Sequence, residues 1–191
     1  KNNLFIEKFN IDRGKIIFLY QGVLSKGRGV DLLLESFVKR KDDKVVIVFM
    51  GFGQLEEDIK TASKEKNNIF FHSAVAPDIV QDYTSSADFG MHMIKNTCLN
   101  HYYCLPNKLF EYANAGLPVV VSNMKEMKEL VEKYDMGVVA KDNKIESINN
   151  AIDKILDLDI ERMKQNSRRC AEENSWNVQE KILKKVYQGM V

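Results

Sequence analysis

The feature that most constrains the fold of this 191-residue chain is a regular alternation of short apolar runs with amphipathic segments. Continuous apolar runs are typical of strands that are covered on both faces. They fall at residues 16–20, 45–50, 68–71, 87–93, 119–121 and 137–140. Strands that alternate with helices indicate βαβ units. The sequence therefore predicts an α/β fold, a Rossmann-like doubly wound parallel sheet of about six strands with helices on both faces.

We expect a single domain over residues 1–191, because a chain of this length can bury a substantial core. The polar opening, residues 1–14, is typical of a linker. Residues 159–191 are predicted to form C-terminal helices, and Trp176 is expected to anchor the last of them.

Charge and cysteine content argue against several kinds of protein. The 28 basic and 27 acidic residues nearly balance, so no bulk field attracts nucleic acid. The three cysteines lack CxxC spacing, which indicates neither a disulfide framework nor a zinc site. The only DxD motif, at residues 157–159, falls between two predicted helices and is interpreted as a helix junction. We expect no metal, no cofactor, no nucleic-acid partner and a cytoplasmic location, with the inner membrane face as an alternative.

Glycine-rich or polar loops follow the first four predicted strands. They are Gly22–Gly29, Gly51–Gly53, His72–Val75 and Asn96–Glu111. Parallel strands with right-handed crossovers place such loops along one edge of the sheet, where α/β folds bind ligands. A glycine-rich turn before a helix also offers converging N–H groups to an anion. The sequence therefore predicts an anionic-ligand site at this edge.

The first loop does not match the motif of nucleoside triphosphatases. It has the spacing of GxxxxGK, but Arg28 replaces the lysine and Gly29 replaces the Ser or Thr that would hold Mg²⁺. The alternative to an anion site is a tight turn with Arg28 on the surface.

The residues from Asn96 to Ser122 add a polar helix start. The helix is predicted to begin at Pro106, where a missing N–H costs nothing. Asn107, Lys108 and Glu111 are then three or four residues apart on neighbouring parts of one face. Such a trio near the positive end of a helix suits an anionic ligand. A solvated face with an ordinary ion pair is the alternative.

Two histidines are interpreted differently. His72 ends a predicted strand, where it either contacts a ligand or packs against the fold. His92 lies within an apolar strand and is expected to be a core residue with its hydrogen bonds satisfied.

Four segments in this order resemble a known family: YQGVLSKGRG, a strand ending in GFG, a strand ending in FFHSAV, and LPNKLFEYANAGLPVVVS. They are similar to the C-terminal, donor-binding domain of GT-B glycosyltransferases of family 4, in the subgroup with a PNKxFEY signature. The similarity runs from about Ile16 to Ala140. It implies one half of a two-domain fold, with the N-terminal acceptor domain absent from this chain and this half alone inactive.

The resemblance also implies roles for individual residues. Glu111 matches the second glutamate of the family's E-x7-E motif, which binds the donor ribose. Arg28 stands where the family usually has a lysine, and the resemblance implies that Arg28 and Lys108 act in catalysis by stabilising the diphosphate leaving group. The other substrate-binding residues it implies are Gly22, Gly51, Phe52 and Gly53, where backbone approaches the ligand, His72, Ala74 and Val75 beside the base, and Asn107 at the helix start.

Two positions depart from the family pattern. Tyr103 stands where the first, sugar-contacting glutamate is usually found, and Val23 where an arginine is frequent. We expect the polar residues Asn96, Thr97 and Asn100 to replace the missing sugar contacts.

The resemblance therefore implies a retaining, metal-independent glycosyltransferase of the hexosyltransferase type. Its donor would be a nucleoside diphosphate sugar such as a UDP-sugar, and its acceptor a saccharide or lipid-linked glycan in bacterial surface polysaccharide or glycoconjugate biosynthesis. The alternatives are one half of a GT-B-like nucleotide-sugar epimerase or phosphorylase, or a noncatalytic nucleotide-binding module.

Overall fold

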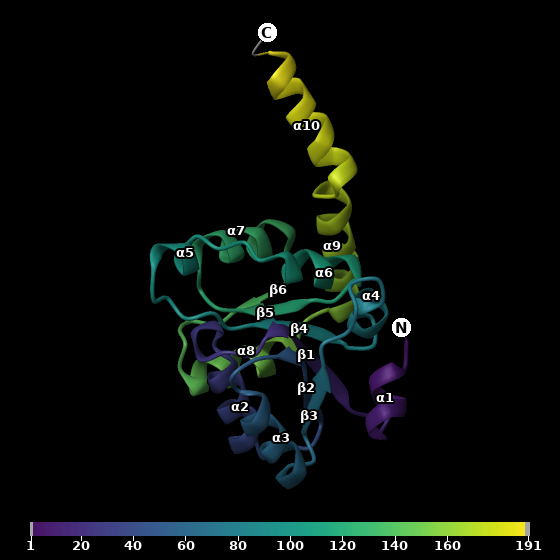
Figure 1. The fold of residues 1–191 in the computed structure, drawn as a ribbon, viewed down its shortest axis with the longest axis vertical. Coiled ribbons are helices and arrows are strands. Elements are labelled where there is room, and N and C mark those ends of the chain that lie inside the picture. The colour runs from purple at the N-terminus through teal and green to yellow at the C-terminus, as the bar shows by residue number, and fades with distance from the viewer. Residues whose placement is uncertain (1, 190–191) are drawn as a thin grey trace.

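One parallel sheet forms the centre of the computed structural model, which describes residues 2–189 (Figure 1). Its six strands lie in the order β3-β2-β1-β4-β5-β6. This confirms the predicted doubly wound α/β fold, and the order is the one expected when two βαβαβ halves meet. The strands are β1 (Ile16–Val23), β2 (Val45–Phe52), β3 (Ile69–Ser73), β4 (Phe89–His92), β5 (Val119–Val121) and β6 (Gly137–Val139).

Helices cover both faces of the sheet, and each face has its own apolar core. One core includes side chains from α2, α3 and α8, the other includes side chains from α1, α4, α6 and α7, and α9 contributes to both. The helices are α1 (Leu4–Phe9), the 3₁₀ turn η1 (Lys26–Arg28), α2 (Val30–Lys39), α3 (Glu56–Glu65), α4 (Val80–Thr84), α5 (Leu99–Tyr102), α6 (Asn107–Asn114), α7 (Lys125–Tyr134), α8 (Ile145–Leu156), α9 (Ile160–Glu173) and α10 (Trp176–Gln188). Within the described chain, no helix has the length and apolar content needed to cross a bilayer.

The two neighbours of β1 pair with it over very different lengths. β2 stays in register with β1 from Ile16↔Val45 to Val23↔Phe52, whereas β4 pairs only at Phe18↔Phe89 and Leu19↔Gly90. The carboxyl end of β1 therefore runs on beyond β4, at the place where the strand order reverses. In open α/β sheets this switch point is where ligands bind.

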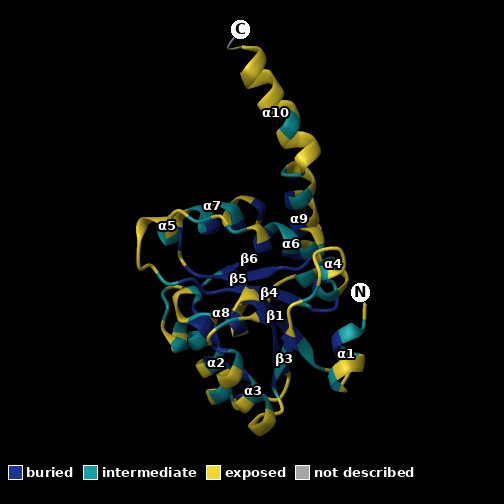
Figure 2. Ribbon diagram, in the orientation of Figure 1, coloured by how far each residue is buried: buried dark blue, intermediate teal, exposed yellow. Residues whose placement is uncertain are grey.

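The C-terminal helices predicted for residues 159–191 are present as α9 and α10, but one expectation at each end of the chain is not met. Residues 4–9 form a helix rather than a linker, because Phe5 is fully buried and packs on Phe9 and Tyr83. Trp176 does not anchor α10: its side chain is 67% exposed, and none of the described residues of that helix is buried. Figure 2 shows α10 running out from the body with an exposed surface.

Two helix boundaries bear on the sequence predictions. Residues 157–159 do form a junction between α8 and α9, and Asp159 caps α9 by accepting a hydrogen bond from the Arg162 N–H at 3.0 Å. The predicted helix at Pro106 begins one residue later, because Pro106 has an extended ψ of 143° and acts as the N-cap of α6.

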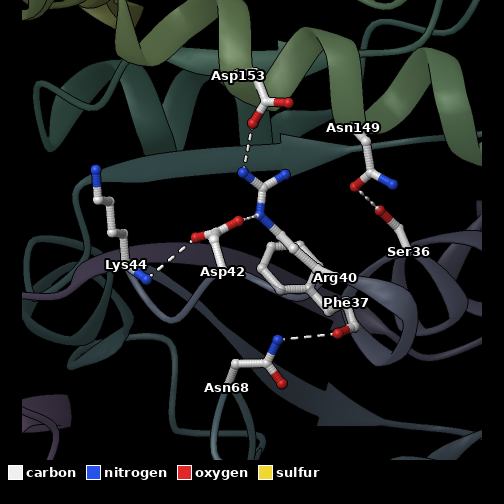
Figure 3. A network of polar contacts seen from close by, with 8 residues as sticks. All are labelled: Ser36, Phe37, Arg40, Asp42, Lys44, Asn68, Asn149 and Asp153. Atoms are coloured by element: carbon white, nitrogen blue, oxygen red, sulfur yellow. Dashed lines mark hydrogen bonds and ion pairs between the residues drawn. The ribbon is translucent and has the colours of Figure 1, made fainter.

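A polar network ties α2 to α8 and to the start of β2 (Figure 3). The guanidinium of Arg40, at the end of α2, is paired with both Asp42 and Asp153. Beside it, the Ser36 hydroxyl donates to Asn149 Oδ1 at 2.7 Å. The side chain of Arg40 is 9% exposed, so its stem also packs against the fold.

We predict that Arg40→Ala lowers the free energy of unfolding by about 1–2 kcal/mol, because it removes both ion pairs and the packing of the stem. Lys39→Ala is the matched control, since Lys39 is exposed and its ion pair with Glu35 lies on the surface of α2. Urea unfolding of both variants measures the difference. Equal stability of the two variants would contradict a structural role for the network.

Candidate functional site

A cavity of about 570 Å³ opens at the carboxyl ends of β1 and β2, beside the start of α6. Its volume is in the range of small-molecule sites. Residues from five segments line it: Gln21, Gly22 and Val23 of β1, Arg28 of η1, Met50, Gly51 and Phe52 of β2, Ala74, Val75, Pro77 and Val80 after β3, and Leu105, Pro106, Asn107, Lys108 and Glu111 around the start of α6.

The cavity brings together many of the residues that the sequence predicted. Those on its wall are Gly22, Arg28, Gly51, Phe52, Ala74, Val75, Asn107, Lys108 and Glu111. Those that do not line it are Gly53, His72, Asn96, Thr97, Asn100 and Tyr103. The loops after β1, β2 and β3 and the start of α6 thus meet at one edge of the sheet, as the topology required.

The amino group of Lys108 has an unusual environment. The residue is only 8% exposed, and Nζ lies 4.0 Å from the centroid of the Tyr20 ring. Among the described residues, Nζ has no hydrogen-bond partner. Burial and then the charge of Arg28 lower the pKa of Lys108 to about 7, although Glu111 opposes the shift. A buried cation without a partner is unfavourable, so this side of the cavity suits an anion.

The backbone at the cavity depends on two glycines. Gly22 has φ +115°, and a Cβ there would lie 3.2 Å from Lys108 Nζ. A Cβ on Gly51 would lie 1.8 Å from the Gly22 carbonyl oxygen. Both glycines were expected where the backbone approaches a ligand, and the close contact of β1 and β2 is a second reason for a glycine at position 51.

The side chain of His72 packs against helices instead of facing the cavity. Its ring lies edge-on to Tyr83, with 4.7 Å between centroids, and also contacts Phe5 and Phe9. Its Nδ1 is 2.6 Å from the Ser73 carbonyl oxygen, and burial lowers the pKa of His72. Of the two alternatives for this side chain, the structure shows packing. Ala74 and Val75, two and three residues further along the chain, do line the cavity.

His92 is fully buried, as predicted, but its hydrogen bonds are not satisfied. Neither ring nitrogen has a partner in the part of the chain that the structure describes. The ring lies nearly parallel to that of Tyr20, with centroids 6.3 Å apart. Burial, and then the cations Lys108 and Arg28, hold the pKa of His92 well below 6.5, so the imidazole is neutral.

The segment from Asn96 to Tyr103 borders the site without lining it. Its polar residues Asn96, Thr97 and Asn100 are exposed, and the ring of Tyr103 lies 5.3 Å from Lys125 Nζ. The preceding Lys95 donates its backbone N–H to the Gly27 carbonyl at 3.2 Å, which places the segment against the Arg28 turn. Sugar contacts from these residues stay a prediction.

Sequence reasoning missed Gln21. Its side chain is only 4% exposed, and Nε2 donates to Glu111 Oε2 at 2.5 Å. The signal was present, because Gln21 is a polar residue at the end of a buried strand, directly before the first glycine of the loop. Met50, Pro77, Val80 and Leu105 also line the cavity and supply apolar wall.

One family model matches most of the chain. Residues 2–172 match the family model described as "Glycosyl transferases group 1". Spore coat protein SA of Bacillus subtilis is 30% identical over an alignment of 194 positions, and the match covers 92% of this chain and 49% of that protein. The chain thus spans about half the length of this curated relative.

Solved structures support the fold. WaaG, described as a glycosyltransferase involved in lipopolysaccharide biosynthesis, matches with a TM-score of 0.70 at 21% identity, over 94% of this chain and 49% of its own. Anabaena HepE in complex with UDP and glucose matches with a TM-score of 0.72 at 15% identity, over 97% of this chain and 52% of its own. Both similarities concern the arrangement of the backbone.

We predict that Lys108→Met stabilises the ligand-free protein by about 1–3 kcal/mol at pH 6, because an apolar side chain replaces a buried charge without a partner. The folded-state pKa of about 7 is below the ordinary value of 10.5. Stability of the parent protein should therefore rise with pH between these two values. The gain from Lys108→Met is largest below pH 7 and shrinks toward pH 10.

Thermal unfolding of parent and variant at pH 6, 8 and 9.5 checks this prediction. Lys125→Met, which alters an exposed lysine outside the cavity, is the control. A gain that does not depend on pH would contradict a lowered pKa of Lys108.

Proposed function

The chain belongs to the group 1 glycosyl transferases, and on this premise we propose that it holds the nucleotide part of a sugar donor during a retaining, metal-independent hexosyl transfer. One observation carries the proposal: a single cavity at the carboxyl edge of the sheet joins Arg28, Lys108 and Glu111. The same cavity has apolar wall at Val75 and Val80. A nucleoside diphosphate offers matching parts, with an anionic diphosphate, a ribose diol and a flat base.

Glu111 is the proposed ribose contact. A carboxylate can accept two hydrogen bonds from the vicinal hydroxyls of a ribose, and charge-assisted bonds of this kind are among the stronger ones. Glu111 lies on the cavity wall in the second turn of α6, about one helical turn after Asn107. The base would then lie toward Ala74 and Val75, where main-chain groups and small side chains leave room for a flat ring.

Arg28 and Lys108 are the proposed diphosphate contacts. When the bond between sugar and phosphate breaks, negative charge accumulates on the leaving diphosphate. Two cations and the N-terminal N–H groups of α6 would stabilise that charge more strongly than the charge of the intact donor. Loss of the leaving group in this manner produces an oxocarbenium-like sugar.

The proposal extends to the wider protein. Because the chain spans about half of its curated relative, we propose that it is the C-terminal, donor-binding half, and that an N-terminal domain supplies the acceptor side and is required for activity. A surface polysaccharide or glycoconjugate pathway at the cytoplasmic face of the membrane is in keeping with relatives named for the spore coat and for lipopolysaccharide biosynthesis. The acceptor would be a saccharide or a lipid-linked glycan.

We predict that Glu111→Ala weakens nucleoside diphosphate binding by about 1–3 kcal/mol, the scale of a lost hydrogen bond to a charged group. Calorimetry with UDP and GDP, followed by transfer assays with their sugars in the complete protein, measures it. Glu129→Ala is the control, since Glu129 is exposed on α7 and outside the cavity. Unchanged affinity in Glu111→Ala would count against the ribose assignment, and a parent protein that binds neither nucleotide would overturn the proposed function.

Replacing Arg28 tests the contacts to the diphosphate separately from the contacts to the nucleoside. We predict that Arg28→Gln lowers affinity for UDP by about 10–100-fold, as expected when charge-assisted hydrogen bonds are lost, and affinity for uridine by about twofold or less. Lys26→Gln is the matched control, because Lys26 is on the same turn but does not line the cavity. Equal losses for UDP and uridine would remove Arg28 from the diphosphate site.

A further inference from the structure

Gln21 links two helices that flank the cavity. It lies near the end of β1, and its buried amide group stands between α4 and α6. On one side its Nε2 donates to Glu111 Oε2 at 2.5 Å, and on the other its Oε1 accepts from the Thr84 hydroxyl at 2.8 Å. Thr84 is itself fully buried at the end of α4.

Chemistry allows only one orientation of this amide. An ionised carboxylate only accepts hydrogen bonds, so the NH₂ group of Gln21 has to face Glu111. Oε1 then faces Thr84, where a hydroxyl is a suitable donor. The Thr84 hydroxyl also lies 2.8 Å from the Val80 carbonyl oxygen, but it has one proton, and only donation to Gln21 leaves no buried amide oxygen without a partner.

We call the side-chain hydrogen bonds from Thr84 to Gln21 and from Gln21 to Glu111 the relay. The main chain on both sides of this relay is fixed as well. The backbone N–H of Gln21 donates to the buried Tyr112 hydroxyl at 3.1 Å. The backbone carbonyl of Glu111 accepts from Gln81 Nε2 at 3.3 Å, a second link between α4 and α6. Glu111 is therefore held at its backbone and at one carboxylate oxygen. A carboxylate has about four acceptor positions, so capacity remains for a ligand.

We propose that Thr84 and Gln21 are positioning residues that fix the Glu111 carboxylate toward a ribose diol, and that preference for ribose over 2′-deoxyribose depends on this relay. The inference rests on the proposed function, because it takes Glu111 as the ribose contact. A long glutamate side chain loses rotamer freedom when it binds a ligand, and a relay that has already restricted it lowers that cost. A side chain that contacts a ligand keeps its geometry when the residues behind it hold it by further hydrogen bonds.

The experiment compares UDP with 2′-deoxy-UDP, and GDP with 2′-deoxy-GDP, by calorimetry on the complete protein. Gln21→Leu keeps the approximate size of the side chain and removes both hydrogen bonds. We expect it to weaken binding of the ribose form by about tenfold, as for loss of one charged hydrogen bond, and to change binding of the 2′-deoxy form much less. The ratio between the two affinities therefore falls.

Thr84 provides a matched series that does not depend on Gln21 variants folding. Thr84→Val removes the hydroxyl at nearly constant shape and is expected to reduce the ribose preference about threefold, whereas Thr84→Ser keeps the hydroxyl and retains the preference of the parent protein. Ser86→Ala is the control, since Ser86 is a nearby buried hydroxyl that donates to the Asp82 carbonyl instead of Gln21. It should leave both affinities unchanged.

A double variant shows whether Gln21 acts through Glu111. In a Glu111→Ala background, Gln21→Leu should cause no further loss, because the group it positions is gone. Additive losses, or equal losses for ribose and 2′-deoxy forms, would mean that Gln21 contributes packing or an independent contact, and would overturn the inference.

The outcome with Glu111→Ala alone separates the two proposals. If it weakens UDP or GDP binding while Gln21→Leu and Thr84→Val do not, the relay is wrong and the proposed ribose contact stands. If Glu111→Ala leaves both affinities unchanged, the ribose assignment fails and the relay fails with it.

Discussion

The candidate site depends on one hydroxyl group, that of Tyr112, which fastens α6 to the sheet where β1 and β4 separate. It accepts from the Gln21 N–H at 3.1 Å and lies 3.1 Å from the Leu19 carbonyl and 3.3 Å from the Met91 carbonyl. The ring fits because residue 90 is glycine, where a Cβ would lie 2.4 Å from ring atoms. These contacts fix α6, which carries Lys108 and Glu111, relative to the end of β1.

The position of α6 determines the environment of the positive charges at the site. With α6 held against β1, Lys108 Nζ lies beside Gly22 and over the Tyr20 ring, away from water and near Arg28. Neutral His92 next to Tyr20 adds no further positive charge. The cavity thus keeps cationic groups in a poorly solvated place, and a bound dianion would relieve that cost. Such an arrangement is preorganised, since the groups need not move when charge develops.

The parts of this molecule that the sequence predicted are those set by pattern and topology. Covered strands are apolar runs, and parallel strands bring their ends to one edge, so the sheet and the cavity at Gly22, Gly51 and Glu111 could be inferred. The direction of a side chain depends on partners far away in the sequence. His72 turns from the cavity because Phe5 and Phe9 pack on it, and they belong to a helix in an opening that resembles a linker in composition.

Gln21 escaped prediction for a related reason. Its importance comes from Thr84 and Glu111, which lie 63 and 90 residues away and meet it only when α4 and α6 pack on the same face. Trp176 shows the opposite error: a large aromatic side chain in a C-terminal helix suggested burial, yet Trp176 is 67% exposed and none of the described residues of α10 is buried. In both cases the residue type alone did not predict the environment of the side chain, because that environment depends on contacts with residues far away in the sequence.

The two ends of the proposed site differ in whether their charged groups already have hydrogen-bond partners within the protein. At Glu111 the polar groups are paired with Gln21 and through it with Thr84, so they resist rearrangement and would hold the ribose equally well before and during reaction. At Lys108 the polar group is unpaired in the described chain, so its interaction energy is available to a charge that grows during reaction. A contact that binds the donor and the transition state equally lowers KM, the donor concentration at half-maximal rate. A contact that strengthens in the transition state raises kcat. Glu111 would thus govern which nucleotide is bound, and Lys108 would govern how easily the sugar is released from it.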